Sequence, residues 1–445
     1  NFFDYYMDSL LLIRAQSILF SKGIHINTQN LYDYKTIREL SDFLLDTNEE
    51  ISYLANTNYP DIKYITYPLE NNNLNYDNII LFGATGFLGI HILYNLLMHT
   101  NSKIFCIIRE KDNVLPMRRL EEKLSFYFPN LDVLSYLDRI QVITGNILEE
   151  NMGISDDMYQ ELGKKVNCVI DVAAIVKHYG NYDIFNKTNV SGTSKILDFC
   201  KQFSIPLHYV STMSVSGFGL VDTPKSDFRE TDLYIGQKYN QNVYVRSKFE
   251  AEKLILEACH KDGLIASIYR VGTITNRYSD GVFQENFNEN AFLNRLSAFI
   301  SLGVIPNELL DFPFEFTPVD YCANFIVHLL KHQSNNIEIY HLFNNNYVVC
   351  RELIKILNNL GLSLTSSSME EFRNKLSNSN SNYFGITSYI ANVFNYNNIN
   401  IYNENTNCKL KSLNLEWPKV DVLYITKILT FLKEKKFIGG NTNET

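Results

Sequence analysis

The sequence predicts an α/β fold, in which helices cover both faces of a doubly wound parallel sheet. Short apolar runs alternate with longer helical patterns, which is typical of chains built from strand–helix–strand units. The runs are apolar at nearly every position, as expected for parallel strands that are buried on both faces. A glycine-rich segment follows the first run and opens a helical pattern. The runs expected to form the sheet are 79–82, 104–108, 140–143, 168–170, 207–210, 266–269 and 339–343.

The composition is that of a globular protein with more than one domain. The 445 residues are 45% hydrophobic and 20% charged. A net charge of −9 argues against a nucleic-acid partner. The seven cysteines form no C-x-x-C pair, so we expect reduced, mostly buried thiols in a cytoplasmic protein. The chain begins without Met and without a basic leader, and we expect it to be part of a longer polypeptide.

Residues 1–47 are predicted to form helices. In the first helix, apolar residues recur at the spacing of a single face. The expected face comprises Leu11, Ala15, Ile18 and Leu19. Thr36 and Glu39 have the spacing of a capping box, so another helix should begin there. From 48 to 76 the periodicity fades, and prolines and a run of asparagines indicate a linker.

The tripeptide Asp8-Ser9-Leu10 stands at the expected start of the first helix. A phosphate esterified to Ser9 would meet free backbone N–H groups at the positive end of the helix dipole. A capping serine with no further role gives the same local pattern. Residues 2–45 as a whole resemble the later three-quarters of an acyl or peptidyl carrier domain. That resemblance implies that Ser9 carries a covalent 4′-phosphopantetheine arm, attached by a phosphopantetheinyl transferase.

The first helix of such a four-helix carrier would precede Asn1. The remaining helices would then expose apolar surface that the first helix normally covers. We therefore expect residues 1–47 to be a partial carrier domain with an exposed apolar face.

Three glycines follow the first predicted strand at the spacing G-x-x-G-x-x-G. Gly83 would allow a tight turn, Gly86 would let a pyrophosphate approach the backbone, and Gly89 would let the helix pack on the strand. The segment predicts a dinucleotide-binding Rossmann domain, which we place at 77–275. The stretch 78–98 is apolar enough to suggest a membrane span, but its glycines favour a buried strand followed by a buried helix.

The end of the second predicted strand bears on the choice of cofactor. An NAD-binding site usually has an acidic residue here for the ribose 2′-hydroxyl. In this chain Arg109 comes first and Glu110 follows it, and Arg119 lies further along. Two guanidinium groups on a 2′-phosphate would favour NADPH. Solvated arginines on a helix face would give the same residues.

Tyr244 and Lys248 form a Y-x-x-x-K pair, which places both residues on one face of a helix. An ammonium beside a phenol favours the phenolate and lowers its pKa from about 10. Tyr244 could then give a proton to a carbonyl oxygen as hydride arrives at carbon, while Lys248 also bonds the nicotinamide ribose. Thr212 follows an apolar strand, where its hydroxyl could steady the substrate oxygen. Order and spacing together predict a catalytic trio of Thr212, Tyr244 and Lys248.

These motifs resemble the extended short-chain dehydrogenase/reductase superfamily. Within it they are most similar to the thioester reductase domains that end polyketide synthases, nonribosomal peptide synthetases and carboxylic acid reductases. The likeness runs from 78 to 342 and implies further cofactor contacts around the glycines and in two later loops. These contacts are Thr85, Phe87, Leu88, Asn146, Ile147, Ala173 and Ala174. Asn146 replaces the family's usual Asp, and Asp171 stands where the family often has His, a difference that the sequence does not explain.

The resemblance implies a releasing enzyme that acts on an acyl chain held by the carrier arm. NADPH would reduce the thioester to an aldehyde at the end of a polyketide synthase, with reduction to an alcohol left open. Upstream synthase domains would supply the chain. Residues 276–437 would form the substrate-binding region, followed by a tail at 438–445.

Three alternatives stay open. The chain could be a fatty acyl-CoA reductase, a nucleotide-sugar epimerase or dehydratase of the same superfamily, or a non-catalytic fragment. No metal site is expected, because His328 and His332 lack the glutamate of the zinc-protease motif.

Overall fold

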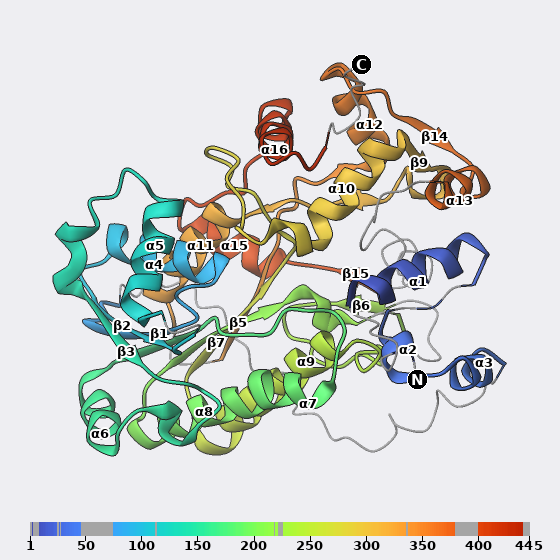
Figure 1. The fold of residues 1–445 in the computed structure, drawn as a ribbon. Helices are drawn as coiled ribbons and strands as arrows, with labels where there is room; N and C mark the ends of the chain where they lie inside the picture. Colours follow the sequence, from blue (N-terminus) through green and yellow to red (C-terminus); the bar gives the residue numbers. More distant parts are fainter. Residues whose placement is uncertain are drawn as a thin grey trace.

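Seven parallel strands form the central sheet of the computed structural model (Figure 1). Their order is β12-β7-β5-β4-β1-β2-β3. They are β1 (Asn78–Phe82), β2 (Lys103–Ile108), β3 (Ile140–Thr144), β4 (Cys168–Asp171), β5 (Leu207–Thr212), β7 (Ala266–Val271) and β12 (Glu338–Leu342). Every apolar run expected to form the sheet is one of these strands, which confirms the predicted α/β fold. The strand order reverses between β1 and β4, and doubly wound sheets bind ligands at the carboxyl ends of such a pair.

The structure describes residues 9–24, 28–45, 74–111, 114–217, 226–334, 337–378 and 399–438, together with Phe2, Ile26, Gly219 and Leu220. Most of the linker predicted at 48–76 lies outside these residues, as does nearly all of the tail predicted at 438–445. Asp8 also lies outside them. The domain boundaries stay predictions.

Helices cover both faces of the sheet (Figure 1). Two separate apolar cores, one on each face, hold them there. The helices are α4 (Phe87–His99), α5 (Pro116–Tyr127) and α11 (Val319–Lys331) on one face, and α6 (Asp156–Lys165), α8 (Gly192–Phe203) and α9 (Val243–Asp262) on the other. The stretch 78–98 is a buried strand and a buried helix, as predicted. In the part of the chain that the structure describes, no helix has both the length and the apolar character to cross a membrane.

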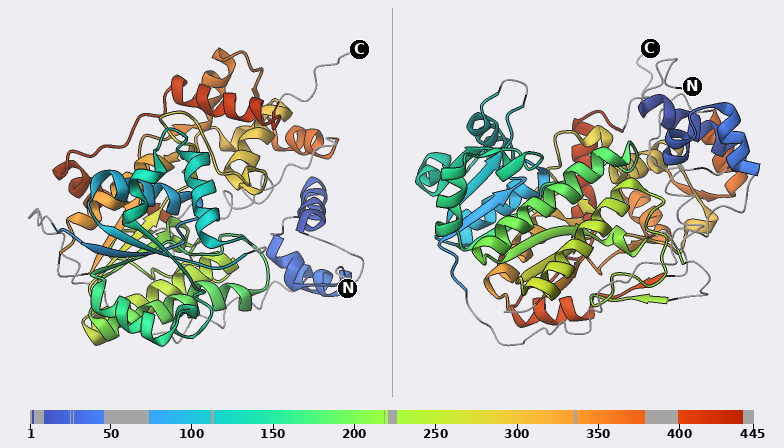
Figure 2. Two further views of the ribbon diagram at one scale, coloured as in Figure 1. Left: turned by 60° about the vertical axis from the view of Figure 1, so that its left-hand side comes forward. Right: turned by 90° about the horizontal axis from the view of Figure 1, so that it is seen from below.

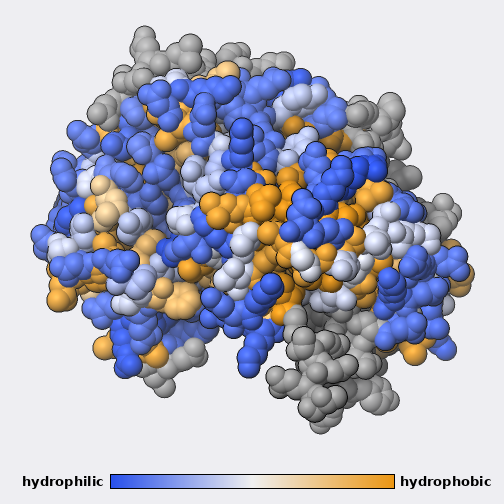
Figure 3. Space-filling view, turned by 90° about the horizontal axis from the view of Figure 1, so that it is seen from above, coloured by the Kyte–Doolittle hydropathy of each residue, from blue (hydrophilic) through white to orange (hydrophobic). Residues whose placement is uncertain are grey.

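Many of the residues after β7, but not α11 or β12, build a second region with its own aromatic core. Phe292 and Phe314 both contact Phe316, which in turn contacts Tyr424. The elements here are β8 (Ile274–Thr275), α10 (Ala291–Leu302), β9 (Val304–Pro306), β10 (Pro313–Phe314), β11 (Thr317–Pro318), β13 (Val348–Val349), α12 (Cys350–Asn359), β14 (Thr365–Ser367), α13 (Met369–Ser377) and α16 (Val422–Glu434). Seen from above, hydrophobic side chains gather near the middle of the surface, with hydrophilic residues around them (Figure 3).

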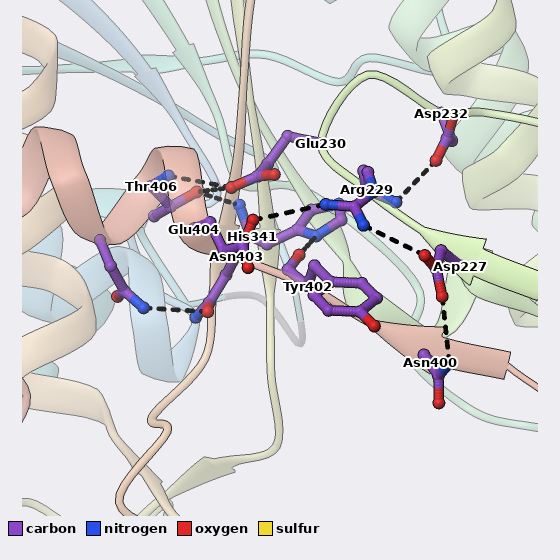
Figure 4. Close-up of polar contacts among 11 residues, drawn as sticks. Asp227, Arg229, Glu230, Asp232, His341, Asn400, Tyr402, Asn403, Glu404 and Thr406 are labelled. Atoms are coloured by element: carbon purple, nitrogen blue, oxygen red, sulfur yellow. Dashed lines mark hydrogen bonds and ion pairs between the residues drawn. The ribbon is translucent and has the colours of Figure 1, made fainter.

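A polar network ties the C-terminal segment to the sheet (Figure 4). Glu230 accepts hydrogen bonds from both the backbone N–H and the hydroxyl of Thr406, at 2.9 and 3.0 Å. The Thr406 hydroxyl accepts from the backbone N–H of His341 on β12, at 2.8 Å. Arg229 lies over the Tyr402 ring, 4.3 Å from its centroid. The elements joined in this way are β6 (Ser226–Phe228), β15 (Ile399–Ile401) and α15 (Glu404–Ser412).

The N-terminal helices form a small unit, called here the N-terminal unit. They are α1 (Ser9–Ser21), α2 (Thr28–Asp33) and α3 (Ile37–Leu45). Leu12, Leu31 and Leu40 are buried in its core. The predicted capping box is confirmed, because the Thr36 N–H donates to the Glu39 carboxylate at 2.9 Å and the Glu39 N–H donates to the Thr36 hydroxyl at 3.2 Å. Both views in Figure 2 place this unit at the margin of the molecule, next to the C-terminal region.

The predicted buried face of α1 is wrong at two positions. Leu11 and Ile18 are 41% and 51% exposed, whereas Leu12 and Phe20 are buried. The run Leu-Leu-Leu-Ile is apolar on every side, so periodicity alone does not select the buried face. Gln16 is also buried, because its amide is held by hydrogen bonds inside the unit. Five apolar side chains of the unit are exposed. They are Leu11, Ile18, Ile37, Leu44 and Leu45.

The cysteines are free thiols, as expected. Six are buried and Cys408 is exposed. Among the described residues, no group of His, Cys, Asp and Glu side chains is arranged to hold a metal ion.

Candidate active site

The glycine segment makes a tight turn between β1 and α4. Gly83 has a φ of +80°, and a Cβ atom there would lie 2.8 Å from backbone atoms of Val172 and Ala173, which follow β4. A Cβ on Gly89 would lie only 2.0 Å from the Gly83 carbonyl oxygen. Gly86 caps α4 and is exposed. Close packing therefore requires Gly83 and Gly89, and Gly86 leaves the start of a long helix open to an anion.

The other predicted residues of this segment surround the turn. Thr85 is half-buried, and Phe87 and Leu88 pack partly against the apolar core below. Phe87 and Leu88 begin α4, so their backbone N–H groups have no acceptor within the helix. They can offer these N–H groups to a phosphate.

An open pocket of about 460 Å³ lies at the carboxyl ends of β2 and β3. Its lining comprises Arg109, Glu110, Lys111, Thr144, Gly145, Asn146, Glu149 and Gly153. Arg119 donates to the backbone carbonyl of Arg109 at 2.7 Å, so it stands at the same strand end. The positive charges of Arg109 and Lys111 in this pocket suit a 2′-phosphate. The acidic residue Glu110 lies beside them.

Asn146 is held by its own loop at this pocket. Its N–H donates to the Met152 carbonyl at 2.7 Å, and its side-chain amide donates to Glu149 at 2.9 Å. Its side-chain oxygen accepts from the Leu148 N–H at 3.1 Å. Ile147 instead packs partly into the core beside the start of α8. The structure therefore brings Asn146 to the pocket and gives Ile147 a packing role.

Thr212 and Tyr244 meet at the end of β5. The Thr212 hydroxyl lies within hydrogen-bonding reach of the Tyr244 phenol, and it also accepts from the Ser214 N–H at 3.2 Å. Asn242 caps α9 by accepting from the N–H groups of Tyr244 and Val245, at 3.0 and 3.1 Å. Burial raises the pKa of Tyr244 to about 12, against the opposing effect of the Thr212 hydrogen bond. The phenol is therefore protonated at neutral pH and can donate a proton.

Lys248 is buried one turn further along α9. Its ammonium donates to the Val210 carbonyl at 2.7 Å and lies 4.0 Å from the centroid of the Tyr209 ring. No hydrogen bond within the described residues joins it to Tyr244. The expectation that Lys248 lowers the pKa of Tyr244 is wrong for this arrangement, since that pKa is raised. Both residues lie on one helix face, but the long lysine side chain extends to β5.

Asp171 is a buried counter-ion for Lys248. It ends β4, pairs with Tyr209 in the sheet register, and accepts from the Ala173 N–H at 3.0 Å. Its second oxygen has no hydrogen-bond partner among the described residues. Burial lowers the pKa of Lys248 to about 8, and the carboxylates of Asp171 and Glu252 oppose this shift. Burial raises the pKa of Asp171 to about 6, and the charge of Lys248 opposes that shift.

The loop 172–180, which carries both predicted alanines, is anchored by two asparagines. Asn189 bonds the N–H and carbonyl of Ile175 at 2.8 and 3.0 Å, and it donates to the Ser247 hydroxyl on α9 at 2.9 Å. Asn242 donates to the carbonyl of His178 at 3.0 Å. These bonds hold the loop against the helix that carries Tyr244 and Lys248. Two short elements follow this loop in the chain, namely α7 (Tyr182–Phe185) and the π-helix η5 (Asn186–Ser191).

Sequence reasoning did not single out Asn242, although an Asn directly before a helical pattern is a capping signal. It also missed Glu252, which follows Lys248 at the same four-residue spacing. Glu252 forms an ion pair with Arg270 of β7 at 2.8 Å, and neither side chain has any exposed surface. Ser211, next to Thr212, donates to the same carboxylate at 2.5 Å.

This ion pair continues into the network of Figure 4. Arg270 donates to Nε2 of His341 at 3.0 Å. Nδ1 of His341 lies 2.5 Å from the Tyr402 carbonyl (Figure 4). Burial and the Arg270 charge hold the pKa of His341 well below its usual range. A neutral ring with its proton on Nδ1 satisfies both contacts. The C-terminal segment is thereby joined to α9 through Glu252 and to β5 through Ser211.

The fold and the site together define a nicotinamide-dependent oxidoreductase of the extended short-chain dehydrogenase/reductase class. A family model described as "Male sterility protein" matches residues 81–326, which is more than half of the chain. The chain belongs to this family.

Terminal reductases are among the proteins that this chain is similar to. A thiolation–reductase di-domain from an archaeal nonribosomal peptide synthetase has a TM-score of 0.85 and 32% identity, over 98% of this chain and 93% of that one. The terminal reductase domain of the myxalamid polyketide–peptide pathway has a TM-score of 0.70 and 27% identity, over 83% and 93%. A linear gramicidin synthase from Brevibacillus parabrevis is 27% identical over 307 residues, which is 68% of this chain but 6% of that protein. The chain thus spans a small part of that relative.

Proposed function

We propose that the chain reduces a carrier-bound acyl thioester to an aldehyde with NADPH, as the releasing domain of a polyketide synthase. The observation that carries this proposal is the meeting of Thr212 and Tyr244 at the end of β5, in the half of the sheet that adjoins the glycine turn. The likeness to reductase domains over most of the chain supports it.

The residues present fit NADPH. Gly83 and Gly89 let the turn pack tightly, and Gly86, which is exposed, leaves the start of α4 open to a pyrophosphate. Arg109 and Arg119 stand where a 2′-phosphate would lie, and we assign them to it. Lys248 would bind the nicotinamide ribose. When bound, NADPH supplies the hydride.

At the thioester, the chain's own residues handle the proton and the developing charge. Tyr244 donates its phenolic proton to the carbonyl oxygen, and the Thr212 hydroxyl donates a hydrogen bond to the same atom. The reduced carbon is then part of a hemithioacetal. Its collapse breaks the carbon–sulfur bond and re-forms a carbonyl as the aldehyde. The hydroxyl proton passes to the sulfur, so the arm leaves as a thiol. Tyr244 regains its proton from solvent before the next turnover.

We assign the N-terminal unit to a partial carrier domain, with Ser9 as the attachment point of the phosphopantetheine arm. Ser9 is the first residue of α1, where a phosphate is favoured by the helix dipole. The exposed apolar side chains of the unit support this assignment, because a complete carrier has one more helix that can cover such surface.

The proposal is tested with the full chain and NADPH. The substrates are an acyl chain on a separate phosphopantetheinylated carrier, the same acyl chain on CoA, and a nucleotide sugar. NADPH absorbance and mass spectrometry of the products are followed, and we expect an aldehyde from the carrier thioester. Preferred use of acyl-CoA would favour a fatty acyl-CoA reductase, and conversion of the sugar an epimerase or dehydratase. No reaction with any substrate would favour a non-catalytic fragment.

A further inference from the structure

The N-terminal unit reaches the loop 172–180 through one side chain. Gln29 on α2 is buried, and its amide bonds both backbone groups of Gly180. It accepts from the Gly180 N–H at 3.0 Å and donates to the Gly180 carbonyl at 3.2 Å. Asp33 accepts a second hydrogen bond from the same amide nitrogen at 2.7 Å. Since a carboxylate only accepts, Asp33 fixes which end of the amide carries the nitrogen.

Gly180 completes a row of anchors along this loop. Amide side chains from three different elements hold its backbone at successive points, namely Asn189 at Ile175, Asn242 at His178 and Gln29 at Gly180. The first two anchors belong to the domain that contains the loop. The third comes from a helix more than a hundred residues away in sequence.

The N-terminal unit has a second attachment, on the C-terminal region. Phe20 of α1 is 2% exposed and is part of the aromatic core there. Arg373 of α13 lies over its ring, 5.0 Å from the centroid, and α1 lies against α13. The unit therefore lies between the loop 172–180 on one side and α13 on the other (Figure 1).

We infer that these contacts form a docking interface, through which the N-terminal unit orders the loop 172–180. The loop starts beside Asp171 and the glycine turn and ends at Gly180. An anchor at Gly180 therefore restricts the movement of the whole loop, including the end beside the glycine turn. The inference rests on the proposed function in one respect, the identity of the unit as a carrier. A carrier that leaves its seat to collect an acyl chain releases Gly180, and its return restores the loop. Reduction is thereby coupled to the presence of the carrier.

Hydrogen–deuterium exchange on the full chain tests the interface without any need for activity. Gln29→Leu keeps a similar volume and removes both bonds to Gly180. We expect the peptide that contains Gly180 to exchange about tenfold faster, the scale of two backbone hydrogen bonds. Gln160→Leu, at an exposed position of α6, is the matched control and should change nothing. Gln29→Glu combined with Asp33→Asn keeps an acceptor for the Gly180 N–H, loses the donor to its carbonyl and avoids two facing carboxylates, so its effect should be intermediate. Should Gln29→Leu also expose α1 to exchange, this double variant decides the matter.

Turnover gives the second measurement. A short acyl-pantetheine thioester needs no carrier, so any loss in Gln29→Leu reports on the reductase site itself. We expect a several-fold lower kcat/KM for NADPH than in Gln160→Leu. Unchanged exchange at Gly180 in both Gln29 variants would overturn the inference, whatever the rate. If the wild type reduces no thioester while exchange at Gly180 still rises in Gln29→Leu, the proposed function fails and the interface stands.

Discussion

Lys248 donates a hydrogen bond to the carbonyl of Val210, 2.7 Å away, although Tyr244 lies one helical turn before it on the same face of α9. The ammonium is thereby held between β5 and the buried carboxylate of Asp171. Tyr244 has Thr212 as its polar partner and keeps its proton. The three predicted catalytic residues lie in one region of the fold. Thr212 and Tyr244 form a pair of hydroxyl groups, and the Lys248 ammonium is bound separately to β5.

Tyr244→Phe tests the proton donor. The ring and its packing stay, and only the hydroxyl is lost, so NADPH affinity should be nearly unchanged. The reduction rate should fall about a hundredfold or more, the scale for losing a positioned acid. Fluorescence titration measures the affinity, and single-turnover oxidation of NADPH measures the rate. Tyr159→Phe, on the buried side of α6, is the control. A wild-type rate in Tyr244→Phe would mean that another group, or water, supplies the proton.

The pH dependence of NADPH binding should reveal the role of Asp171. Lys248 must carry its proton to bind the ribose, and its pKa of about 8 means that affinity falls as the pH rises through that value. Asp171→Asn removes a carboxylate that holds this pKa up. The fall of NADPH affinity at high pH, called here the alkaline limb, should therefore move to lower pH by about one unit. Because the charges interact, the limb belongs to the pair and not to Lys248 alone.

The control for this shift is Asp157→Asn, an exposed acid in the first turn of α6. It should leave the limb in place. The groups that face Lys248 are Asp171 from β4, Glu252 from α9 and Tyr209 from β5. If the limb stays at the wild-type pH in Asp171→Asn, Glu252 alone sustains the charge, and Asp171 has a packing role.

Cofactor choice should depend on the pocket at the end of β2. Replacing Arg109 and Arg119 by Ala should weaken NADPH binding far more than NADH binding. Each charge-assisted bond is worth about 1.5–3 kcal/mol, or roughly ten- to a hundredfold. Arg118→Ala is the matched control, because Arg118 is exposed and paired with Glu122. Equal weakening for both cofactors would show that the arginines serve the loop and not the 2′-phosphate.

Local patterns were sufficient to predict the sheet, the glycine turn and the capping box at Thr36. Each depends on residues close in sequence, where periodicity and spacing carry the information. The buried side of α1 was mispredicted, because Phe20 is drawn toward α13, far along the chain. The direction of Lys248 was also mispredicted. A long side chain has several acceptors within reach, and the Val210 carbonyl and Asp171 come from other strands.

Ser9→Ala should prevent loading of the phosphopantetheine arm and leave NADPH binding intact, because the glycine turn lies in a different part of the fold. Intact-mass measurement follows incubation with CoA and a phosphopantetheinyl transferase. Ser17→Ala, in the same helix, is the control and should still gain the arm. A Ser9→Ala protein that gains the arm would assign it to another serine. A wild type that gains none would mean that the unit is not a working carrier by itself.

The ion pair of Glu252 and Arg270, behind the predicted catalytic trio, should be important for stability as well as position. Arg270→Met leaves the Glu252 carboxylate buried without its partner, so the free energy of unfolding should fall by about 3–5 kcal/mol. Arg351→Met is the matched control, since Arg351 and Asp311 form an exposed pair, with 52% and 82% of their side chains accessible. Its loss should cost about 0–1 kcal/mol. Denaturant unfolding, followed by fluorescence, measures both.

A second variant separates the charge from the packing. Glu252→Gln with Arg270→Met removes both charges and keeps an amide that can still accept from Ser211. Most of the lost stability should return, because no buried charge is left unpaired. If the double variant is stable but its reduction rate is low, the pair positions β5 and α9 for catalysis, since Ser211 adjoins Thr212 and Glu252 lies one turn after Lys248. If both stability and rate return, the pair contributes to stability only, and the hydrogen bonds of Asn189 and Asn242 are sufficient to position the site.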